Sequence, residues 1–189
     1  MSAQQGNTAS SVRPTISDVQ SIRKRAREKI EDGAVTSSYP ADKQEIVRLL
    51  NDALATELVC VLRYKRHFYV ARGIRAKTVA AEFLEHSHEE EGHADKLAER
   101  IVQLGGDPDF NPASLTTRSH AEYHDGTKLG DMVRADLVAE RIAIESYREV
   151  IAYVGDRDST TRRMLEEILA SEEQHADDLV DMLQDLPKD

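Results

Sequence analysis

The sequence predicts an all-α fold in which four long helices form one bundle, with a long crossover between the second and third. Apolar side chains recur every three or four residues over four long stretches. Only 9 Gly and 5 Pro interrupt the 189 residues, whereas a sandwich or barrel needs a turn signal about every 8–12 residues. Short links within each helix pair and one long link between the pairs indicate the crossover type of four-helix bundle.

Residues 1–40 are expected to form an extension ahead of a bundle domain over residues 41–189. We interpret residues 1–15 as a disordered polar tail and about 16–31 as a short basic helix. The boundary is the stretch GAVTSSYP at residues 33–40, where the composition changes.

The first two long helices are predicted over residues 41–72 and 76–104. Gly73 follows the first helix and Gly105-Gly106 follows the second, and glycine is common immediately after a helix. These two helices should therefore form an antiparallel pair.

The second pair is predicted over residues 128–155 and 158–186. Gly155 ends its first helix and Pro187 follows its second. The link over about 105–127 is rich in Pro, Asn, Ser and His, and we expect it to cross from one pair to the other.

Composition narrows the functional classes. No apolar run approaches the roughly 18 residues of a membrane span, and the polar N-terminus MSAQQGNTASS lacks the apolar segment of a signal peptide. A single cysteine, Cys60, fits a reducing cytoplasm. The net charge of −10 disfavours nucleic-acid binding by the folded body and suits attraction of cations.

Acidic residues and histidines interrupt the apolar stripes that should face the core. They are Glu57 in the first helix, His86, Glu90 and His93 in the second, Glu140 in the third, and Glu172 and His175 in the fourth. Burying four carboxylates together is costly without a counter-charge, and two divalent cations would supply +4 against −4. Moving the stripes would instead bury Arg63, Lys96, Arg141 or Arg163, so we expect those four residues outside the core.

The spacing supports a metal site. Residues 90–93 and 172–175 both read E-x-x-H, which places a carboxylate and an imidazole one turn apart on one helix face. One Glu from each of two helices plus one such pair from each of the other two is the ligand set of di-iron and di-manganese carboxylate sites. The halves repeat further, because Tyr64 and Tyr147 each follow a stripe Glu by seven residues.

At these residues the sequence resembles the ferritin superfamily, and most closely the bacterioferritins. The similarity covers about 41–186 and includes TELV around Glu57, EEEGHADKLAERI around Glu90, ADLVAE ending at Glu140, and EILASEEQH ending at His175. The resemblance implies a ferritin-like bundle that holds two iron ions per subunit. It also implies a ferroxidase that oxidises Fe(II) with O2 or H2O2 and stores or detoxifies iron in a hollow homo-oligomer.

Residue by residue, the resemblance implies terminal ligands at Glu57 and Glu140, bridging carboxylates at Glu90 and Glu172, imidazole ligands at His93 and His175, and a tyrosine beside the centre at Tyr64. In bacterioferritins a haem-ligating methionine follows the first bridging glutamate. Here that position is Glu91, so we expect no haem.

Few residues follow the expected end of the fourth long helix near Leu186, so we expect no fifth helix of the kind that 24-subunit ferritins have. With its N-terminal extension it resembles the Dps family, so 12 subunits are favoured over 24. Dps-like proteins with a bacterioferritin-type site carry a cysteine pair near the metals, whereas this chain has only Cys60.

Two other functions stay open. A di-metal peroxidase or manganese catalase would use the same six ligands without storing a mineral, and the sequence does not decide between iron and manganese. A Dps-type DNA-protecting protein would bind DNA phosphates through the basic residues at 23–29, but nearby acidic residues favour docking on a neighbouring subunit instead.

Several further residues carry weaker signals. His86 fits a metal-associated residue and a hydrogen-bonded core histidine about equally well. His120 and His124 have the i, i+4 spacing of a metal pair if that part of the crossover is helical. We interpret Glu82, Glu85 and Glu89 as a solvated helix face rather than a face that holds iron, and Cys60 as a small buried residue.

Overall fold

A computed structural model describes residues 17–74 and 76–186, and every regular element in those ranges is helical. The α-helices are α1 (Val19–Arg25), α2 (Lys43–Val70), α3 (Ala76–Gln103), α4 (Leu115–Arg118), α5 (Leu129–Val154) and α6 (Ser159–Asp185). Two 3-10 turns, Ile30–Asp32 and Gly155–Arg157, complete the list. Within the described ranges, no helix combines the length and apolar character needed to cross a bilayer.

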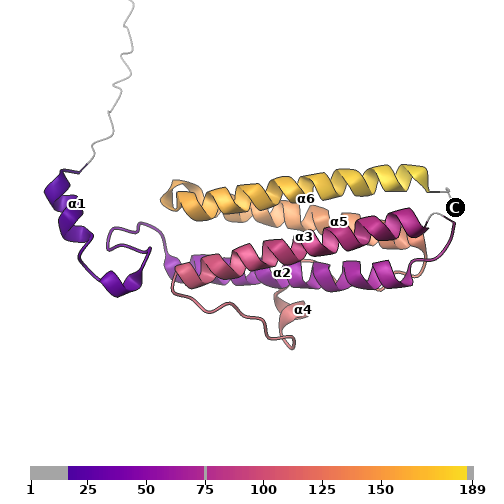
Figure 1. Cartoon of the computed structure of the whole chain (residues 1–189), viewed down its shortest axis with the longest axis horizontal. Coiled ribbons are helices and arrows are strands. Elements are labelled where there is room, and N and C mark those ends of the chain that lie inside the picture. The colour runs from indigo at the N-terminus through magenta and orange to yellow at the C-terminus, as the bar shows by residue number, and fades with distance from the viewer. Residues whose placement is uncertain (1–16, 75, 187–189) are drawn as a thin grey trace, which may run out of the picture. The chain divides into compact units, whose positions relative to one another are not determined.

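The four long helices form the predicted bundle (Figure 1). Helix α2 packs along α3, α5 packs along α6, and the two pairs meet through α2 with α5 and α3 with α6. The link from α3 to α5 carries the short helix α4, which packs on α2. The all-α prediction with a crossover between the second and third long helices is confirmed.

Acidic caps fix where two of the long helices begin. The Asp42 side chain accepts hydrogen bonds from the first free backbone N–H groups of α2, and Asp158 does the same for α6. Asp158 is buried and also accepts hydrogen bonds from Arg100 at 2.9 Å and from the Tyr39 hydroxyl at 2.5 Å. This cap therefore ties the start of α6 to α3.

The N-terminal unit, taken by itself, contains a shorter helix than predicted. Helix α1 covers seven residues and is followed by turns instead of continuing to about residue 31. Lys29 adopts a left-handed backbone conformation with φ 46°, which a continuing α-helix cannot accommodate. The tail predicted over residues 1–15 lies outside the described residues, and the domain boundary after residue 40 stays a prediction.

One buried basic residue contradicts the sequence analysis. Lys96, Arg141 and Arg163 are exposed as expected, but Arg63 is completely buried. Its Nε donates to the Asp136 carboxylate at 2.7 Å, and His67 Nδ1 lies 2.8 Å from the other oxygen of Asp136. The prediction for Arg63 was wrong because a buried acidic partner on α5 compensates its charge.

The crossover does not place His120 and His124 on a helix. Helix α4 ends at Arg118, and residues 119–125 form bends and irregular chain. The backbone N–H of His120 donates to Thr56 Oγ1 at 3.0 Å, and the His124 carbonyl lies 3.1 Å from His67 Nε2. The helical condition for a metal pair at His120 and His124 is therefore not met.

Candidate metal centre

The six-residue cluster predicted from the stripes lies in the middle of the bundle and receives side chains from all four long helices. It consists of Glu57 from α2, Glu90 and His93 from α3, Glu140 from α5, and Glu172 and His175 from α6. All six side chains are buried, because the 3-and-4 spacing that brings apolar neighbours inward brings these residues inward too.

The six residues form two overlapping groups that could each hold one metal ion. One group is Glu57, Glu90, His93 and Glu172, and the other is Glu90, Glu140, Glu172 and His175. Within each group, one ligand atom per residue lies within 4.8 Å of the others. Glu90 and Glu172 belong to both groups, which is the position that a bridging carboxylate needs.

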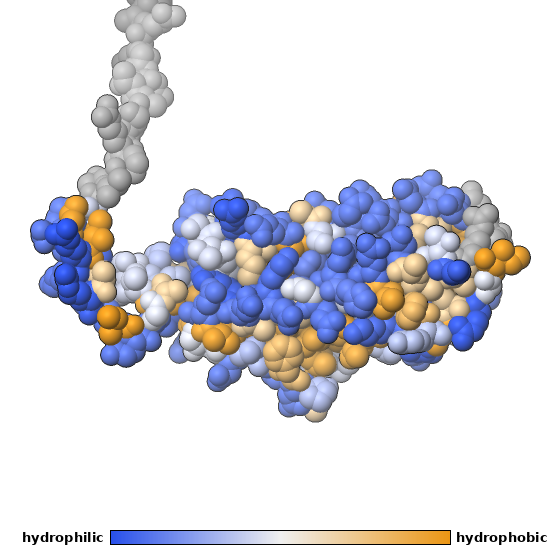
Figure 2. Space-filling view, in the orientation of Figure 1, coloured by the Kyte–Doolittle hydropathy of each residue, from blue (hydrophilic) through white to orange (hydrophobic). Residues whose placement is uncertain are grey.

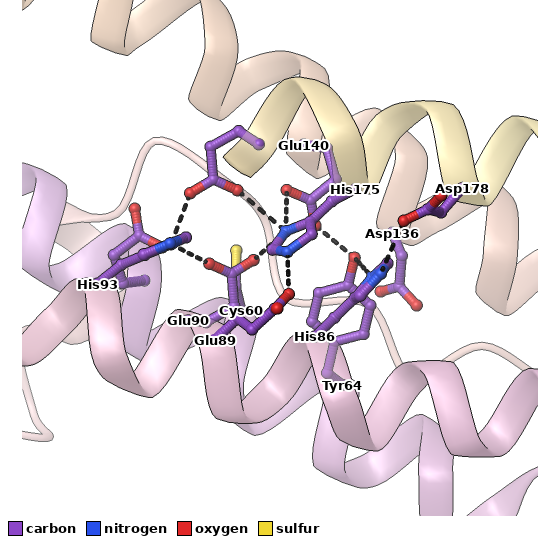
Figure 3. A network of polar contacts seen from close by, with 12 residues as sticks. Cys60, Tyr64, His86, Glu89, Glu90, His93, Asp136, Glu140, His175 and Asp178 are labelled. Atoms are coloured by element: carbon purple, nitrogen blue, oxygen red, sulfur yellow. Dashed lines mark hydrogen bonds and ion pairs between the residues drawn. The ribbon is translucent and has the colours of Figure 1, made fainter. Parts of the chain in front are cut away.

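Both imidazoles face the shared carboxylates through Nδ1 (Figure 3). His93 Nδ1 lies 2.9 Å from Glu90 Oε2 and 2.9 Å from Glu172 Oε1. His175 Nδ1 lies 3.5 Å from Glu90 Oε1 and 3.4 Å from Glu172 Oε2. The two rings thus approach the same pair of carboxylates, and their centroids are 6.1 Å apart.

The cluster leaves polar atoms without partners, and this observation tests its fit to metal ions. Among the described residues, the buried side-chain nitrogen and oxygen atoms that lack a hydrogen bond are Glu90 Oε1, Glu140 Oε2, Glu172 Oε1, Glu172 Oε2 and His175 Nδ1. All of them belong to the six-residue cluster. Buried polar atoms are normally hydrogen-bonded, and carboxylate oxygens with imidazole nitrogens are ordinary donors to iron, manganese and zinc. The residues therefore fit a pair of cations.

In the metal-free cluster, the pKa values of the glutamates are shifted in different directions. Burial, together with the charges of Glu172 and Glu90, raises the pKa of Glu57 well above its usual value. Burial also raises the pKa of Glu140 in the same way. Burial opposes ionisation of Glu90 as well, but the nearby imidazoles of His175 and His93 outweigh it and lower the pKa of Glu90.

The two histidines take up protons when no metal is present. Burial lowers the pKa of each imidazole, but the neighbouring carboxylates Glu172 and Glu90 outweigh it. The resulting pKa is about 9 for His93 and about 12 for His175. Cations entering the cluster must therefore displace protons.

Two buried tyrosines connect the halves of the bundle. The Tyr64 hydroxyl on α2 donates a short hydrogen bond to Glu140 on α5, and the Tyr147 hydroxyl on α5 donates one to Glu57 on α2. The sequence analysis placed Tyr64 beside the centre but treated Tyr147 only as its repeat partner. The shared seven-residue offset from a stripe Glu is the signal that identifies Tyr147 as well.

Residues around the cluster include one that the sequence analysis placed on a solvated face. Glu89 is half-exposed, yet its Oε2 lies 2.5 Å from His175 Nε2 (Figure 3). His86 is buried, stacks on His175 at a centroid distance of 4.2 Å, and places Nδ1 3.3 Å from the Tyr64 hydroxyl. Cys60 is buried as predicted, 3.5 Å from Arg63 Nη2.

An acidic cavity lies between α3 and α6 on the outside of the bundle. It has a volume of about 620 Å³, and its acidic lining residues are Glu82, Glu85, Asp178, Asp181 and Asp185. The surface over these two helices is largely hydrophilic (Figure 2). Glu91 lies on α3. Its side chain is 57% exposed, and its Oε2 lies 3.7 Å from Lys65 Nζ.

Comparisons with known proteins identify the family of the chain. The model of the ferritin-like domain matches residues 47–188. A bacterioferritin from Brucella melitensis is 33% identical over 147 residues, which cover 76% of this chain and 86% of that protein. A bacterioferritin from Rhodobacter capsulatus is 30% identical over 134 residues, covering 70% of this chain and 79% of that protein.

Solved structures show the same fold. The bacterioferritin-related protein from Bacteroides fragilis, described as a dodecameric thioferritin, is 32% identical with a TM-score of 0.75. That alignment covers 77% of this chain and 88% of the other. A Dps protein from Bacillus brevis is 25% identical with a TM-score of 0.71, covering 75% and 96% of the two chains. The bundle, the buried carboxylate–histidine cluster and these relatives together show that the chain belongs to the ferritin-like family, among relatives named bacterioferritin.

Proposed function

We propose that the protein is a ferroxidase that oxidises Fe(II) with O2 or H2O2 at the six-residue cluster and stores the product. The single observation that carries this proposal is the set of buried oxygen and nitrogen atoms without hydrogen bonds, all within that cluster. A buried group that exists for stability alone would be satisfied by protein partners, as the rest of the described core is.

Two ferrous ions would bind as substrate, one in each overlapping group, with Glu90 and Glu172 between them. Together they supply two electrons, which with two protons reduce O2 to H2O2 or, with H2O2 as oxidant, give two water molecules. The carboxylates favour the harder ferric product. Where only one of the two positions holds a ferrous ion, Tyr64 would supply the second electron of either reduction and pass its phenolic proton to Glu140, which accepts its hydrogen bond.

The protein's own residues manage the charge of this reaction. In the metal-free state the cluster holds protons on His93 and His175 and on the carboxyls with raised pKa, Glu57 and Glu140. Binding two cations releases these protons and leaves Nδ1 of each imidazole free to coordinate. The hydroxyls of Tyr64 and Tyr147 then hold the outer carboxylates in place.

Storage requires a hollow homo-oligomer, and we propose a shell of 12 subunits in preference to 24. The Bacteroides fragilis relative described as dodecameric supports this number.

We propose no haem site, because Glu91 occupies the position of the haem-ligating methionine and its side chain is largely exposed. The extension over residues 1–40 would support contacts between subunits, and the single cysteine supports a cytoplasmic location.

The test is Fe(II) oxidation followed by the ferric absorbance after mixing anaerobic iron with O2 or H2O2. Glu90→Ala should abolish the rapid phase, because Glu90 belongs to both metal groups. The matched control is Glu91→Ala, which removes an adjacent exposed glutamate and should leave the rate unchanged. Parental rates in Glu90→Ala, with helical content intact, would show that the cluster is not the oxidation site.

The mass of the assembly and the amount of metal that it stores distinguish the proposed function from the alternatives. A di-metal peroxidase or manganese catalase would bind two ions per subunit and accumulate no mineral. Light scattering with iron analysis distinguishes them, because a 12-subunit shell of 21.2 kDa chains would carry far more iron than its two sites per subunit. DNA protection would instead appear as salt-sensitive DNA retardation that requires residues 1–31.

A further inference from the structure

The two histidines of the cluster are alike on the inner side of the ring and different on the outer side. Both turn Nδ1 toward Glu90 and Glu172. On the outer side, His175 Nε2 lies 2.5 Å from Glu89 Oε2. Among the described residues, no protein group makes the corresponding hydrogen bond to Nε2 of His93. The two halves of the cluster are therefore alike in the residues that face the cation positions and different in the residues that contact the outer side of the histidines.

The sequence explains this difference. Glu89 directly precedes Glu90 on α3, and its carboxylate reaches across to His175 on α6. The equivalent position in the other half, directly before Glu172, is Ser171. A serine side chain is shorter than a glutamate side chain and carries no charge, so it cannot hold the ring of His93 in the same way.

The contact with Glu89 decides which nitrogen of His175 can bind a cation. The Glu89 carboxylate accepts a hydrogen bond from Nε2–H, so Nδ1 is the nitrogen that presents a lone pair when a cation enters the cluster. His175 Nδ1 is buried and has no hydrogen bond, as a nitrogen reserved for a ligand would be. His86 stacks on the same ring at 4.2 Å with an interplanar angle of 22°, so the ring is held at its edge and on its face.

We propose that Glu89 is a positioning residue that makes the cation position formed with His175 bind divalent ions more tightly than the position formed with His93. This inference rests on the proposed function, in which the cluster holds two cations. Carboxylates that orient a metal-binding histidine typically contribute 10–100-fold to metal affinity. The two positions should then fill in sequence, the His175 position first.

The experiment is anaerobic calorimetric titration of the metal-free full-length protein with Co²⁺, which does not turn over. The unmodified protein should bind two ions per subunit in two classes of unequal affinity. Glu89→Ala should weaken the tighter class by about 10–100-fold, and Glu89→Gln should weaken it less, because the amide oxygen still accepts the hydrogen bond. The visible spectrum of bound Co²⁺ reports whether an imidazole has left its coordination.

Two further variants sharpen the test. Glu85→Ala is the matched control, because it removes the same charge from α3 in the acidic cavity without a hydrogen bond to either histidine. It should leave both affinities unchanged. Ser171→Glu should tighten the weaker class, since it places a carboxylate at the position equivalent to Glu89.

The possible outcomes distinguish a failure of the proposed function from a failure of the proposed role of Glu89. Fewer than two Co²⁺ ions per subunit in the unmodified protein would overturn the proposed function. Two ions of equal affinity, or a Glu89→Ala variant that behaves like Glu85→Ala, would overturn the role of Glu89 alone. Equal weakening of both classes in Glu89→Ala would also overturn it, because a positioning contact acts on one ring.

Discussion

Two of the clusters of charged residues that the bundle buries differ in how completely the protein satisfies their hydrogen-bonding groups. In the first cluster, the Arg63 network, Arg63 and His67 of α2 meet Asp136 of α5. Arg63 Nη1 donates to the Glu122 carbonyl at 3.1 Å, and His67 Nε2 lies 3.1 Å from the His124 carbonyl. In the six-residue cluster, by contrast, five buried atoms have no hydrogen bond.

This difference separates a structural group of charges from a binding site. The Arg63 network pairs a cation with an anion and satisfies its hydrogen-bonding groups within the protein, so it can hold the crossover against the bundle. The six-residue cluster has four carboxyl groups against two imidazoles and an incomplete set of partners. Burial of charge alone therefore does not point to a metal site, whereas burial combined with missing partners is what we expect of one.

The largest expected effect comes from breaking the Arg63 network. Asp136→Ala leaves a buried guanidinium without its counter-charge, and we expect the free energy of unfolding to fall by about 3–5 kcal/mol. Glu140→Gln in the six-residue cluster should have a small or stabilising effect on the metal-free protein, because it removes a carboxylate from a crowded group. Urea unfolding of both metal-free variants measures the difference, and equal losses would remove the distinction between the clusters.

A second effect concerns pH. The pKa of His93 is raised to about 9 in the folded metal-free protein. The stability that this histidine contributes is therefore fully present below its unfolded pKa near 6.5 and is lost as the pH rises through 9. We expect a loss on the order of 3 kcal/mol from this residue. Urea unfolding at pH 6, 7.5 and 9 measures it, and an equally steep decline in His93→Gln would contradict this assignment.

Metal should stabilise the protein through one cluster only. At a free Zn²⁺ concentration of 100 times the Kd, each occupied position should raise the free energy of unfolding by about 2.7 kcal/mol. Glu172→Ala should lose most of this gain, because Glu172 belongs to both metal groups. Asp136→Asn should start from a lower stability but keep the gain. If Asp136→Asn keeps its helical structure but is no longer stabilised by Zn²⁺, the Arg63 network would belong to the metal site.

These two clusters also show what the sequence could predict. The four long helices and the six-residue cluster follow from local periodicity, because a residue in step with the apolar stripe is carried inward with it. Arg63 lies outside that stripe and is buried all the same, because its partner Asp136, 73 residues away in the chain, compensates its charge. Such long-range pairing leaves no periodic signal.

The contact of Glu89 escaped the sequence analysis for a related reason. Glu89 lies out of step with the stripe and is half-exposed, so periodicity assigns it to the solvated face. Its partner His175 lies 86 residues away on another helix. The early end of helix α1 was missed because composition indicates helical potential but not where the backbone turns.

The smallest expected effects distinguish the two tyrosines within the six-residue cluster. Tyr147→Phe and Tyr64→Phe each remove one hydrogen bond to a buried carboxyl group, so each should lower the free energy of unfolding by about 1 kcal/mol. They should differ in redox behaviour, because the Tyr64 hydroxyl also contacts His86 at 3.3 Å. If Tyr64 donates an electron during oxidation, freeze-quenched samples should show a tyrosyl radical signal that persists in Tyr147→Phe and disappears in Tyr64→Phe. A signal that instead disappears only in Tyr147→Phe would assign the electron donor to the other half of the bundle.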